Sequence, residues 1–525
     1  MKIGQYINFI FFQRHIDPRN PAYNGFDTFM SQMEFVKRHQ IPATFLLQYD
    51  VLCDEAYTDI LKSSDSSIEI GGWFEIVQEL AEDAGIKWRG REGYSWDWYA
   101  NVGFSVGYTP DERRRLVDTY MKKYYAVFGC YPKSFGSWLI DAYTLDYMHR
   151  QYGVNASCNC RDQWGTDGYT LWGGYYGNAY YPSKNNVLCP ADSSENQIDV
   201  PIFRMLGSDP IHQYDIGLEC DENGELMPLE CQGVATLEPY YKDTVGGGVP
   251  SWVDWYLDET FCKDGLGFHY TQAGQENSFP WDAVKDGLEY QIGVMKKMEA
   301  EGRVQFVTLG EVAARFRAAY KSTPATVLSA KRDWDESKQR KTLWYLSKHY
   351  RLNVYIEKDR FWLRDLFLFD SAYPERYSEQ VCESKAFVYD NLPIMDGNRW
   401  SGGTVRAGIY FRSPKQTEPR FGEIQVSYPE SGIMLAEVTD QTGRSYTIYC
   451  TEDYAEIRGP IGFSLEWRAG QSADFSATTA KEMLLCHNGY SYSLRLKNGE
   501  FEKKDVLSCG VKSENGVITF LLGQL

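Results

Sequence analysis

The chain has 525 residues, more than a single hydrophobic core usually organises, so we expect two or three domains. Its net charge of -18 at pH 7 argues against partners such as nucleic acid or an anionic membrane surface, because both require clustered lysine and arginine. No stretch approaches the roughly 20 apolar residues of a membrane span.

Aromatic residues make up 15% of the chain, with 15 Trp and 39 Tyr. Aromatic rings stack on the C–H faces of sugars, and a neutral polyol suits an acidic protein. A large aromatic core would give the same composition, so composition leaves both interpretations open.

Residues 1 to about 322 alternate between strand-like and helix-like patterns. The predicted strands are 6–13, 43–48, 67–71, 133–139, 154–159, 198–205, 266–270 and 304–308. The predicted helices are 27–39, 55–62, 74–82, 110–128, 143–151, 282–301 and one that begins at residue 311. This alternation predicts an α/β fold with parallel strands, and seven or eight strands in one run favour a (β/α)7-8 barrel. The competing fold is an open doubly wound sheet, but no strand is followed by a glycine-rich phosphate-binding loop.

Past residue 323, hydrophobic and polar residues alternate, as in 352–356 and 424–427. Turn signals such as Asp396-Gly397-Asn398 separate these runs. The pattern is typical of an antiparallel β-sandwich. We therefore predict a catalytic barrel domain over residues 1–322 and a C-terminal β-sandwich domain over residues 323–525.

Three short motifs resemble the glycoside hydrolase/deacetylase (β/α)-barrel superfamily: His15-Ile16-Asp17, Glu69-Ile70-Gly71 and the strand-to-helix turn 306–311. The superfamily includes NodB-type polysaccharide deacetylases and α-mannosidase-like barrels, and the resemblance covers residues 5–320. The chain looks closest to an uncharacterised bacterial family of glycoside hydrolase-like proteins with this two-domain layout. The resemblance implies a hydrolase with a carbohydrate substrate.

One departure concerns the metal. A NodB-type deacetylase holds a divalent metal with an Asp pair after the first strand and an H-x-x-x-H motif after the third. Here the third-strand motif continues as Gly72-Trp73-Phe74-Glu75, without histidine. A divalent metal such as zinc would still have carboxylate and imidazole ligands. The candidates are His15 and Asp17, together with Asp141, His212 or His269.

Glycoside hydrolysis needs two carboxyl groups, one that donates a proton and one that attacks or activates water. Catalytic groups of a parallel barrel lie at the C-terminal ends of its strands. The acids at such places are Asp17, Glu75, Asp141 and Glu276. By resemblance to α-glucan-acting members, we expect Asp141 after the fourth strand to be the nucleophile and Glu276 after the seventh to be the acid/base.

Each candidate also has a structural interpretation. Asp141 precedes a predicted helix and would cap it, and Glu75 would lie in the first turn of another. Glu276 would be a solvated loop carboxylate, and Asp17 would only initiate a turn before Pro18. His15 would be a satisfied core histidine.

Other polar and aromatic residues near the presumed strand ends are candidates for binding sugar. They are His15, Trp73, Trp138, Asp162, Trp164, His212, His269 and Tyr270. Tryptophan and tyrosine are also frequent in 88–108, in 164–176 and in 252–256. Such rings predict stacking subsites if they are exposed, and small cores beneath long loops if they are buried.

The leading hypothesis is a glycoside hydrolase that acts on an oligosaccharide or polysaccharide through paired carboxylates. The alternatives are a metal-dependent polysaccharide deacetylase and a non-catalytic glycan-binding protein on a degenerate barrel. The N-terminal apolar run lacks the cleavage site of a signal peptide, so we expect a cytoplasmic protein, or a periplasmic or secreted one if a signal was removed. The oligomeric state stays open.

Overall fold

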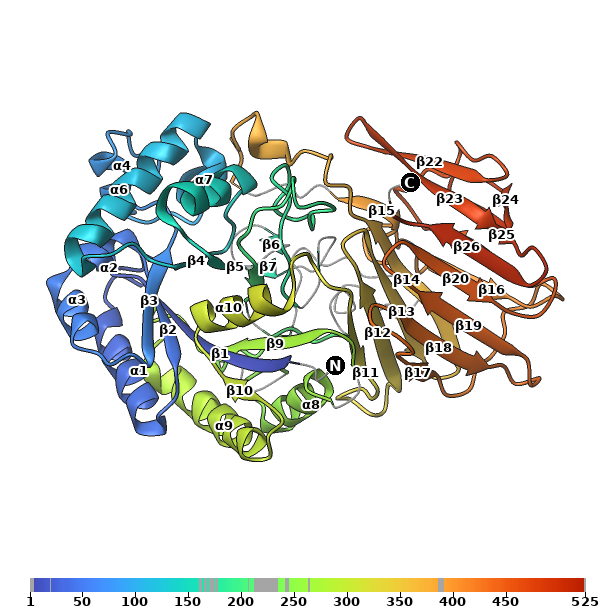
Figure 1. The fold of residues 1–525 in the computed structure, drawn as a ribbon, viewed down its shortest axis with the longest axis horizontal. Helices are drawn as coiled ribbons and strands as arrows, with labels where there is room; N and C mark the ends of the chain where they lie inside the picture. The colour runs from blue at the N-terminus through green and yellow to red at the C-terminus, as the bar shows by residue number, and fades with distance from the viewer. Residues whose placement is uncertain are drawn as a thin grey trace.

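The computed structural model describes residues 4–18, 20–159, 163–164, 168–169, 175, 178–205, 207–211, 235–240, 245–262, 265–385 and 391–523. Two architectures follow one another along the chain (Figure 1). The N-terminal part is a curled parallel sheet covered by helices, and the C-terminal part consists of two antiparallel sheets. The predicted fold class is therefore confirmed.

Eight parallel strands build the barrel wall. They are β1 (Gly4–Gln13), β2 (Ala43–Leu47), β3 (Ile68–Trp73), β4 (Ser134–Ser137), β5 (Ala156–Asn159), β8 (Ile202–Arg204), β9 (Phe268–Ala273) and β10 (Gln305–Phe306). The hydrogen-bonded order is β10-β1-β2-β3-β4-β5-β8, and β9 pairs with β1. No strand pairing joins β8 to β9 in the described part of the chain. The rings of Phe203 and Tyr270, with centroids 5.0 Å apart, pack across this seam. The wall is thus a deformed barrel whose last junction is made by side chains.

The helices are α1 (Gly25–His39), α2 (Tyr49–Cys53), α3 (Glu55–Lys62), α4 (Gln78–Asp83), α5 (Ala100–Gly103), α6 (Pro110–Phe128), α7 (Ala142–Tyr152), α8 (Pro250–Thr260), α9 (Trp281–Ala300) and α10 (Leu309–Ala319). Helix α6 begins at the predicted capping box, in which Thr109 and Glu112 bind each other's backbone N–H groups. Helix α4 begins four residues later than predicted, and this leaves Glu75 in the loop before it.

Side-chain alternation along β1 decides which residues reach the interior of the barrel. Phe9 contacts Phe35 of α1, and Phe11 contacts Phe45 of β2 on the same outer face of the sheet. Asn8 donates into the interior, and Phe12 stacks on a ring from β3. Arg14 continues the inward series just beyond the strand, because successive side chains point to opposite faces.

The C-terminal domain is a β-sandwich of two sheets. The first contains β11 (Thr326–Ala330), β12 (Arg340–Leu346), β13 (Tyr350–Glu357), β14 (Arg360–Leu368), β15 (Leu392–Met395), β16 (Gly408–Arg412), β21 (Ser464–Arg468), β25 (Ser508–Lys512) and β24 (Glu500–Lys503). The second contains β17 (Gln425–Ser427), β18 (Met434–Thr439), β19 (Ser445–Cys450), β20 (Tyr454–Arg458), β26 (Val517–Leu521), β23 (Tyr490–Asn498) and β22 (Glu482–His487). One apolar cluster contains inward side chains of both sheets, such as Leu343 and Ala436. A short 3-10 helix, η3 (Arg376–Ser378), lies in a long connection after β14.

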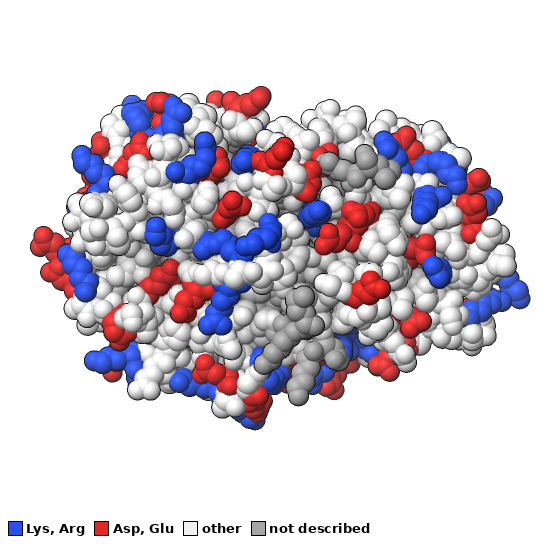
Figure 2. All heavy atoms as spheres, viewed as in Figure 1, with Lys and Arg blue, Asp and Glu red and all other residues white. Residues whose placement is uncertain are grey.

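Helix α8 was not expected from the sequence. It contains Trp252, Trp255 and Tyr256, whose side chains are all buried. These rings therefore form core and not exposed stacking sites. None of the helices in the described residues combines the length and apolar character needed to cross a bilayer. On the face drawn in Figure 2, acidic and basic residues are interspersed.

Candidate active site

Arg14 joins two of the predicted carboxylates at the C-terminal end of the barrel. Its Nε donates to Glu75 Oε2 at 3.0 Å and its Nη2 donates to Glu75 Oε1 at 2.8 Å. Its Nη1 donates to Glu276 Oε2. All three side chains are buried. Burial opposes the charge of Arg14, yet Glu276 and Glu75 raise the pKa of its guanidinium above the usual range.

The backbone around this ion cluster is held in place by Asn277. Its Nδ2 donates to the carbonyl of Arg14 at 2.8 Å, and its Oδ1 accepts from the N–H of Arg14 at 2.8 Å. Gly274 makes this approach possible: its φ is +108°, and a Cβ there would lie 2.2 Å from the carbonyl oxygen of Ile10. The turn after β9 is therefore fixed against the end of β1.

Aromatic rings lie below and above the guanidinium. Trp73 stacks on Phe12 with centroids 4.0 Å apart, and Trp138 meets Phe12 edge-on at 5.6 Å. The ring of Trp96 lies over the guanidinium carbon of Arg14 at 4.2 Å. Trp73 is 0% exposed and Trp138 is 6% exposed. Trp73 therefore packs beneath the cluster and is not accessible to a sugar. Only a small part of Trp138 is accessible.

The rim of the cluster is formed by the loop after β1. Asp17 is 9% exposed, and its charge acts on Arg14. The Nε2 atom of His15 lies 3.0 Å from Asp54 Oδ2, and both side chains are partly exposed. His15 is thus a rim residue and does not lie in the core.

Asp50 adds a further carboxyl to this rim. It lies in the first turn of α2 and accepts hydrogen bonds from the backbone N–H groups of Val51 and His15. Asp50 is surrounded by many protein atoms, but part of the residue is still exposed to solvent. Desolvation raises the pKa of Asp50 to about 6, although His15 opposes the shift. Asp50 can therefore exchange a proton near neutral pH.

The structure places Asp141 in a different set of contacts. Asp141 is the N-cap of α7, where Oδ1 accepts from the N–H of Thr144 at 3.0 Å. Oδ1 also accepts from Arg113 Nη1 at 3.0 Å, and Oδ2 accepts from the Thr144 hydroxyl at 2.7 Å. The side chain is 1% exposed. These contacts support the capping interpretation and do not join Asp141 to Glu276.

His269 and Tyr270 lie within β9 and not at its end. The strand continues to Ala273, three residues beyond the predicted end. The Nδ1 atom of His269 lies 3.0 Å from the carbonyl oxygen of Thr260, and burial lowers the pKa of His269. The Tyr270 hydroxyl donates to Asn8 inside the barrel at 3.4 Å. Both side chains are buried away from the carboxylate cluster's rim.

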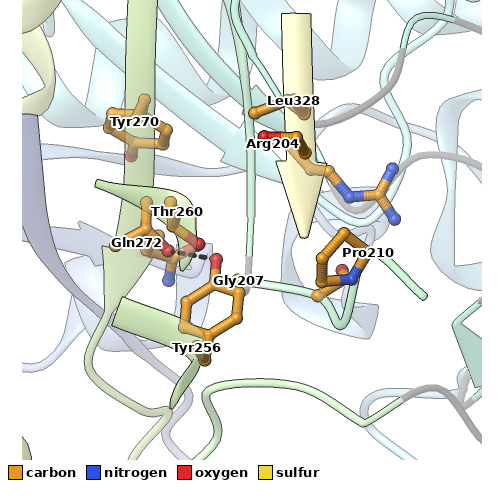
Figure 3. Close-up of a pocket in the computed structure, with 11 residues that line it drawn as sticks. Arg204, Gly207, Pro210, Tyr256, Thr260, Tyr270, Gln272 and Leu328 are labelled. Carbon is orange, nitrogen blue, oxygen red and sulfur yellow. Dashed lines mark hydrogen bonds between the residues drawn. The ribbon is translucent and has the colours of Figure 1, made fainter. Parts of the chain in front are cut away.

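Tyr270 also lines a cavity at the seam between β8 and β9, shown in Figure 3. Leu328 of β11 closes it from the C-terminal domain, and the hydroxyls of Tyr256 and Thr271 lie 2.9 Å apart at its wall. The cavity has a volume of about 30 Å³. It accommodates water but not a sugar ring.

The side chains of three predicted residues lie outside the described structure. Asp162 and His212 lie outside the described residues. Trp164 belongs to the short strand β6 (Gln163–Trp164), which pairs with β7 (Gly168–Tyr169), but its side chain is outside the description. Their predicted contacts with sugar stay predictions.

The aromatic segment 88–108 folds largely on itself. Arg91 binds Asp97 through Nε and Nη2, each at 2.9 Å. The rings of Tyr94, Trp98 and Tyr99 surround the guanidinium of Arg91 at 4.0–4.4 Å. Most of these rings therefore form a small core. The loop reaches the candidate site through Trp96.

The described residues do not fit the predicted metal. They contain no group of three His, Cys, Asp or Glu side chains that could hold an ion. His15 is bonded to Asp54, whereas Asp17 lies in the field of Arg14. The guanidinium of Arg14 supplies the positive charge between Glu75 and Glu276, where a second cation would be repelled.

Sequence analysis missed Arg14, Asp50 and Trp96. Arg14 could have been found from the sequence, because an arginine that points into the barrel at the end of a strand needs buried carboxylates to balance its charge. Asp50 follows β2 by three residues, and α2 is too short to show helical periodicity. Trp96 had no signal that separated it from its aromatic neighbours.

Comparison with known proteins agrees with this fold. Residues 109–329 match the family model of a domain of unknown function with a solved structure, DUF3863. No curated protein matches the chain.

Solved structures with a similar fold include a putative glycoside hydrolase/deacetylase from Parabacteroides distasonis. It overlaps with a TM-score of 0.51 and 14% identity, covering 73% of this chain and 89% of that chain. A putative polysaccharide deacetylase from Mycobacterium smegmatis has a TM-score of 0.33 and 12% identity, covering 61% and 92%. The allantoinase Puue has a TM-score of 0.34 and 9% identity, covering 60% and 91%. The chain thus matches the DUF3863 family model over residues 109–329 and shares its barrel fold with the protein from Parabacteroides distasonis.

Proposed function

We propose that the C-terminal end of the barrel is the active site of a glycoside hydrolase that acts on an oligosaccharide or polysaccharide. The observation that carries the proposal is the arrangement around Arg14. One buried guanidinium binds Glu75 and Glu276. The rim beside it presents Asp17 and Asp50, and the carboxyl of Asp50 has a pKa of about 6.

The chemistry requires two carboxyl groups in different protonation states. Asp50, with a pKa of about 6, is suited to donate a proton to the leaving glycosidic oxygen. Asp17 lies beside the guanidinium of Arg14, and the two charges attract each other. In the proposal Asp17 attacks the anomeric carbon or activates water, and Asp50 gives its proton to the departing sugar.

Glu75 and Glu276 have a positioning role in this scheme. Their bonds to Arg14 hold its charge at one place beneath the rim. Gln48 Nε2 donates to Glu75 Oε2 at 2.6 Å and fixes that carboxylate further. Glu276 is 4% exposed and its carboxylate is bound to Arg14, which suits a positioning role.

The test measures hydrolysis of a panel of aryl glycosides and oligosaccharides by purified variants. Asp50→Asn and Asp17→Asn should each lower kcat/KM at least about 100-fold, the lower range for losing one acid or base. Asp59→Asn on α3 is the matched control, because its side chain is 71% exposed and pairs with Lys62 at the surface. Turnover that survives both site variants would refute the assignment of residues.

The same panel includes N-acetylated oligosaccharides assayed for acetate release, with and without added zinc. Release of acetate that depends on zinc, without cleavage of glycosidic bonds, would overturn the hydrolase proposal in favour of deacetylation. Binding of glycans without either reaction would favour a non-catalytic glycan-binding protein.

A further inference from the structure

A wide groove lies on the C-terminal domain, away from the cluster around Arg14. The segment 373–380 forms one side, and the turn between β22 and β23 contributes Asn488 on the other. The groove has a volume of about 750 Å³. Figure 1 shows the segment in orange at the top of the molecule, between α7 and the β22–β23 hairpin. Its size is within the range of sites that bind small ligands.

The groove is lined mainly by hydrogen-bonding side chains, and the exposed Pro374 adds an apolar face. The polar lining residues include Arg376, Glu379, Gln380 and Asn488. Glu379 and Gln380 are exposed, and their side chains have no hydrogen-bond partner among the described residues. A ligand with many hydroxyl groups and small apolar faces matches this combination of polar walls and one exposed proline.

An aromatic pair supports the floor. The ring centroids of Tyr373 and Tyr490 are 4.6 Å apart, and the Tyr490 hydroxyl donates to Asp370. The Tyr373 ring is therefore held between the segment and the hairpin. Tyr373 is 6% exposed, so it supports the floor from beneath and does not itself offer a stacking surface.

The segment is also tied firmly to the barrel. Glu375 accepts from the N–H of Ala142 at 2.9 Å and from the N–H of Val187 at 3.0 Å. Arg113 Nη2 donates to the carbonyl of Tyr377 at 2.8 Å. Further along, the N–H of Cys382 donates to the carbonyl of Val106 at 2.7 Å. These bonds give the groove a preformed wall.

Two other cavities fit this kind of ligand less well. The seam cavity holds only about 30 Å³. A groove of about 350 Å³ at the edge of the sandwich combines apolar side chains such as Leu343 and Ile356 with two lysines, Lys331 and Lys341. Its volume is less than half of the 750 Å³ of the first groove, so it has less room for an oligosaccharide.

From these observations we infer that the groove between residues 373–380 and Asn488 binds a neutral oligosaccharide. One cation, Arg376, and one exposed anion, Glu379, face the groove together with Glu375, so no single sign of charge dominates it. The inference does not depend on catalysis at Asp50 and Asp17. It gives the C-terminal domain a glycan-binding site of its own.

The experiment is calorimetric titration of the full chain with neutral oligosaccharides of four to six sugars. The panel contains α-1,4-glucan, β-1,4-glucan, β-1,3-glucan and β-1,4-mannan, with oligogalacturonate as an acidic comparison. At least one neutral oligosaccharide should bind, and the double variant Gln380→Ala/Asn488→Ala should raise its Kd at least tenfold. Both residues are exposed, so the variant should fold, and an unchanged circular dichroism spectrum checks this.

Two further variants separate this site from others. Asp50→Asn should bind the oligosaccharide with unchanged Kd even when turnover is lost. Gln425→Ala, in the groove at the sandwich edge, is the matched control and should also bind normally. The inference is overturned if no neutral oligosaccharide binds, if the double variant binds as tightly as the wild type, or if oligogalacturonate binds more tightly than every neutral ligand.

Discussion

Arg14 and Glu75 meet through two parallel hydrogen bonds, from Nε to Oε2 at 3.0 Å and from Nη2 to Oε1 at 2.8 Å. The two residues follow β1 and β3, and both belong to inward-pointing series. Glu276, which follows β9, binds the third nitrogen of the same guanidinium. The curled sheet thus collects three distant charges at one point. Planar bidentate geometry of this kind is specific to arginine.

The first prediction concerns this cluster. Arg14→Met should lower the free energy of unfolding by about 3–5 kcal/mol, because it leaves two buried carboxylates without their counter-charge. Arg14→Lys should also destabilise the fold, since an ammonium group cannot form the two parallel bonds to Glu75. Urea denaturation measured at pH 7 gives both values.

A surface pair serves as the control. Lys62 and Asp59 are 42% and 71% exposed and lie 3.1 Å apart. Lys62→Met should change the unfolding free energy by less than about 1 kcal/mol. Equal effects of Lys62→Met and Arg14→Met would contradict the role of Arg14 as a buried counter-charge.

The second prediction concerns pH and Asp50. A proton donor with a pKa of about 6 is charged and inactive at higher pH, so kcat/KM should fall as pH rises through about 6. Asp50→Asn should abolish this alkaline limb along with most of the activity. A pH–rate profile from pH 4 to pH 9 shows both effects, and an alkaline limb that persists in the residual activity of the variant would assign it to another group.

The same shift predicts an effect on stability. The folded protein holds the pKa of Asp50 above its ordinary value, so ionisation of Asp50 disfavours folding at neutral pH. Asp50→Asn should therefore raise the denaturation midpoint at pH 7 and change it much less at pH 3.5, where the carboxyl is mostly protonated in both states. A stabilising effect of equal size at both pH values would contradict this explanation.

The sequence predicted the barrel because its strand and helix patterns are long and regular. It also predicted that Asp17, Glu75 and Glu276 share one end, since parallel strands all point the same way. It did not predict their contacts, because periodicity encodes which face is buried and not which side chain lies opposite. The end of β9 was placed three residues early because buried polar side chains, Thr271 and Gln272, interrupt its apolar run.

The third prediction concerns Asp141. Asp141→Asn preserves a good helix cap but removes the charge that faces buried Arg113. The variant should be less stable by several kcal/mol, of the order expected for a broken buried ion pair. Its turnover per folded molecule should stay within about twofold of the wild type. A loss of kcat at a temperature where the variant is fully folded would instead support the nucleophile role suggested by the resemblance.

The fourth prediction concerns metal removal. The donors in the described part of the site are already engaged, with His15 on Asp54 and both buried glutamates on Arg14. Dialysis against a chelator should therefore leave the thermal midpoint and glycosidase turnover unchanged. Loss of either property, restored by zinc, would show that residues outside the described ranges complete a metal site.

The last prediction concerns Glu375, which fastens the segment after β14 to the start of α7. Desolvation and the neighbouring charge of Asp141 raise the pKa of Glu375 to about 8. Below its ordinary pKa the group is protonated in both states, so its contribution to stability is then fully present. As pH rises towards about 8, the unfolded chain ionises while the folded one resists, so stability falls and then levels off. Glu375→Gln should flatten this part of the stability–pH curve. Urea midpoints at half-unit steps from pH 4 to pH 9 measure the slope, and Glu379→Gln, exposed on the same segment, is the matched control that should keep it. An unchanged slope of the stability–pH curve in Glu375→Gln would mean that a group other than Glu375 takes up the proton.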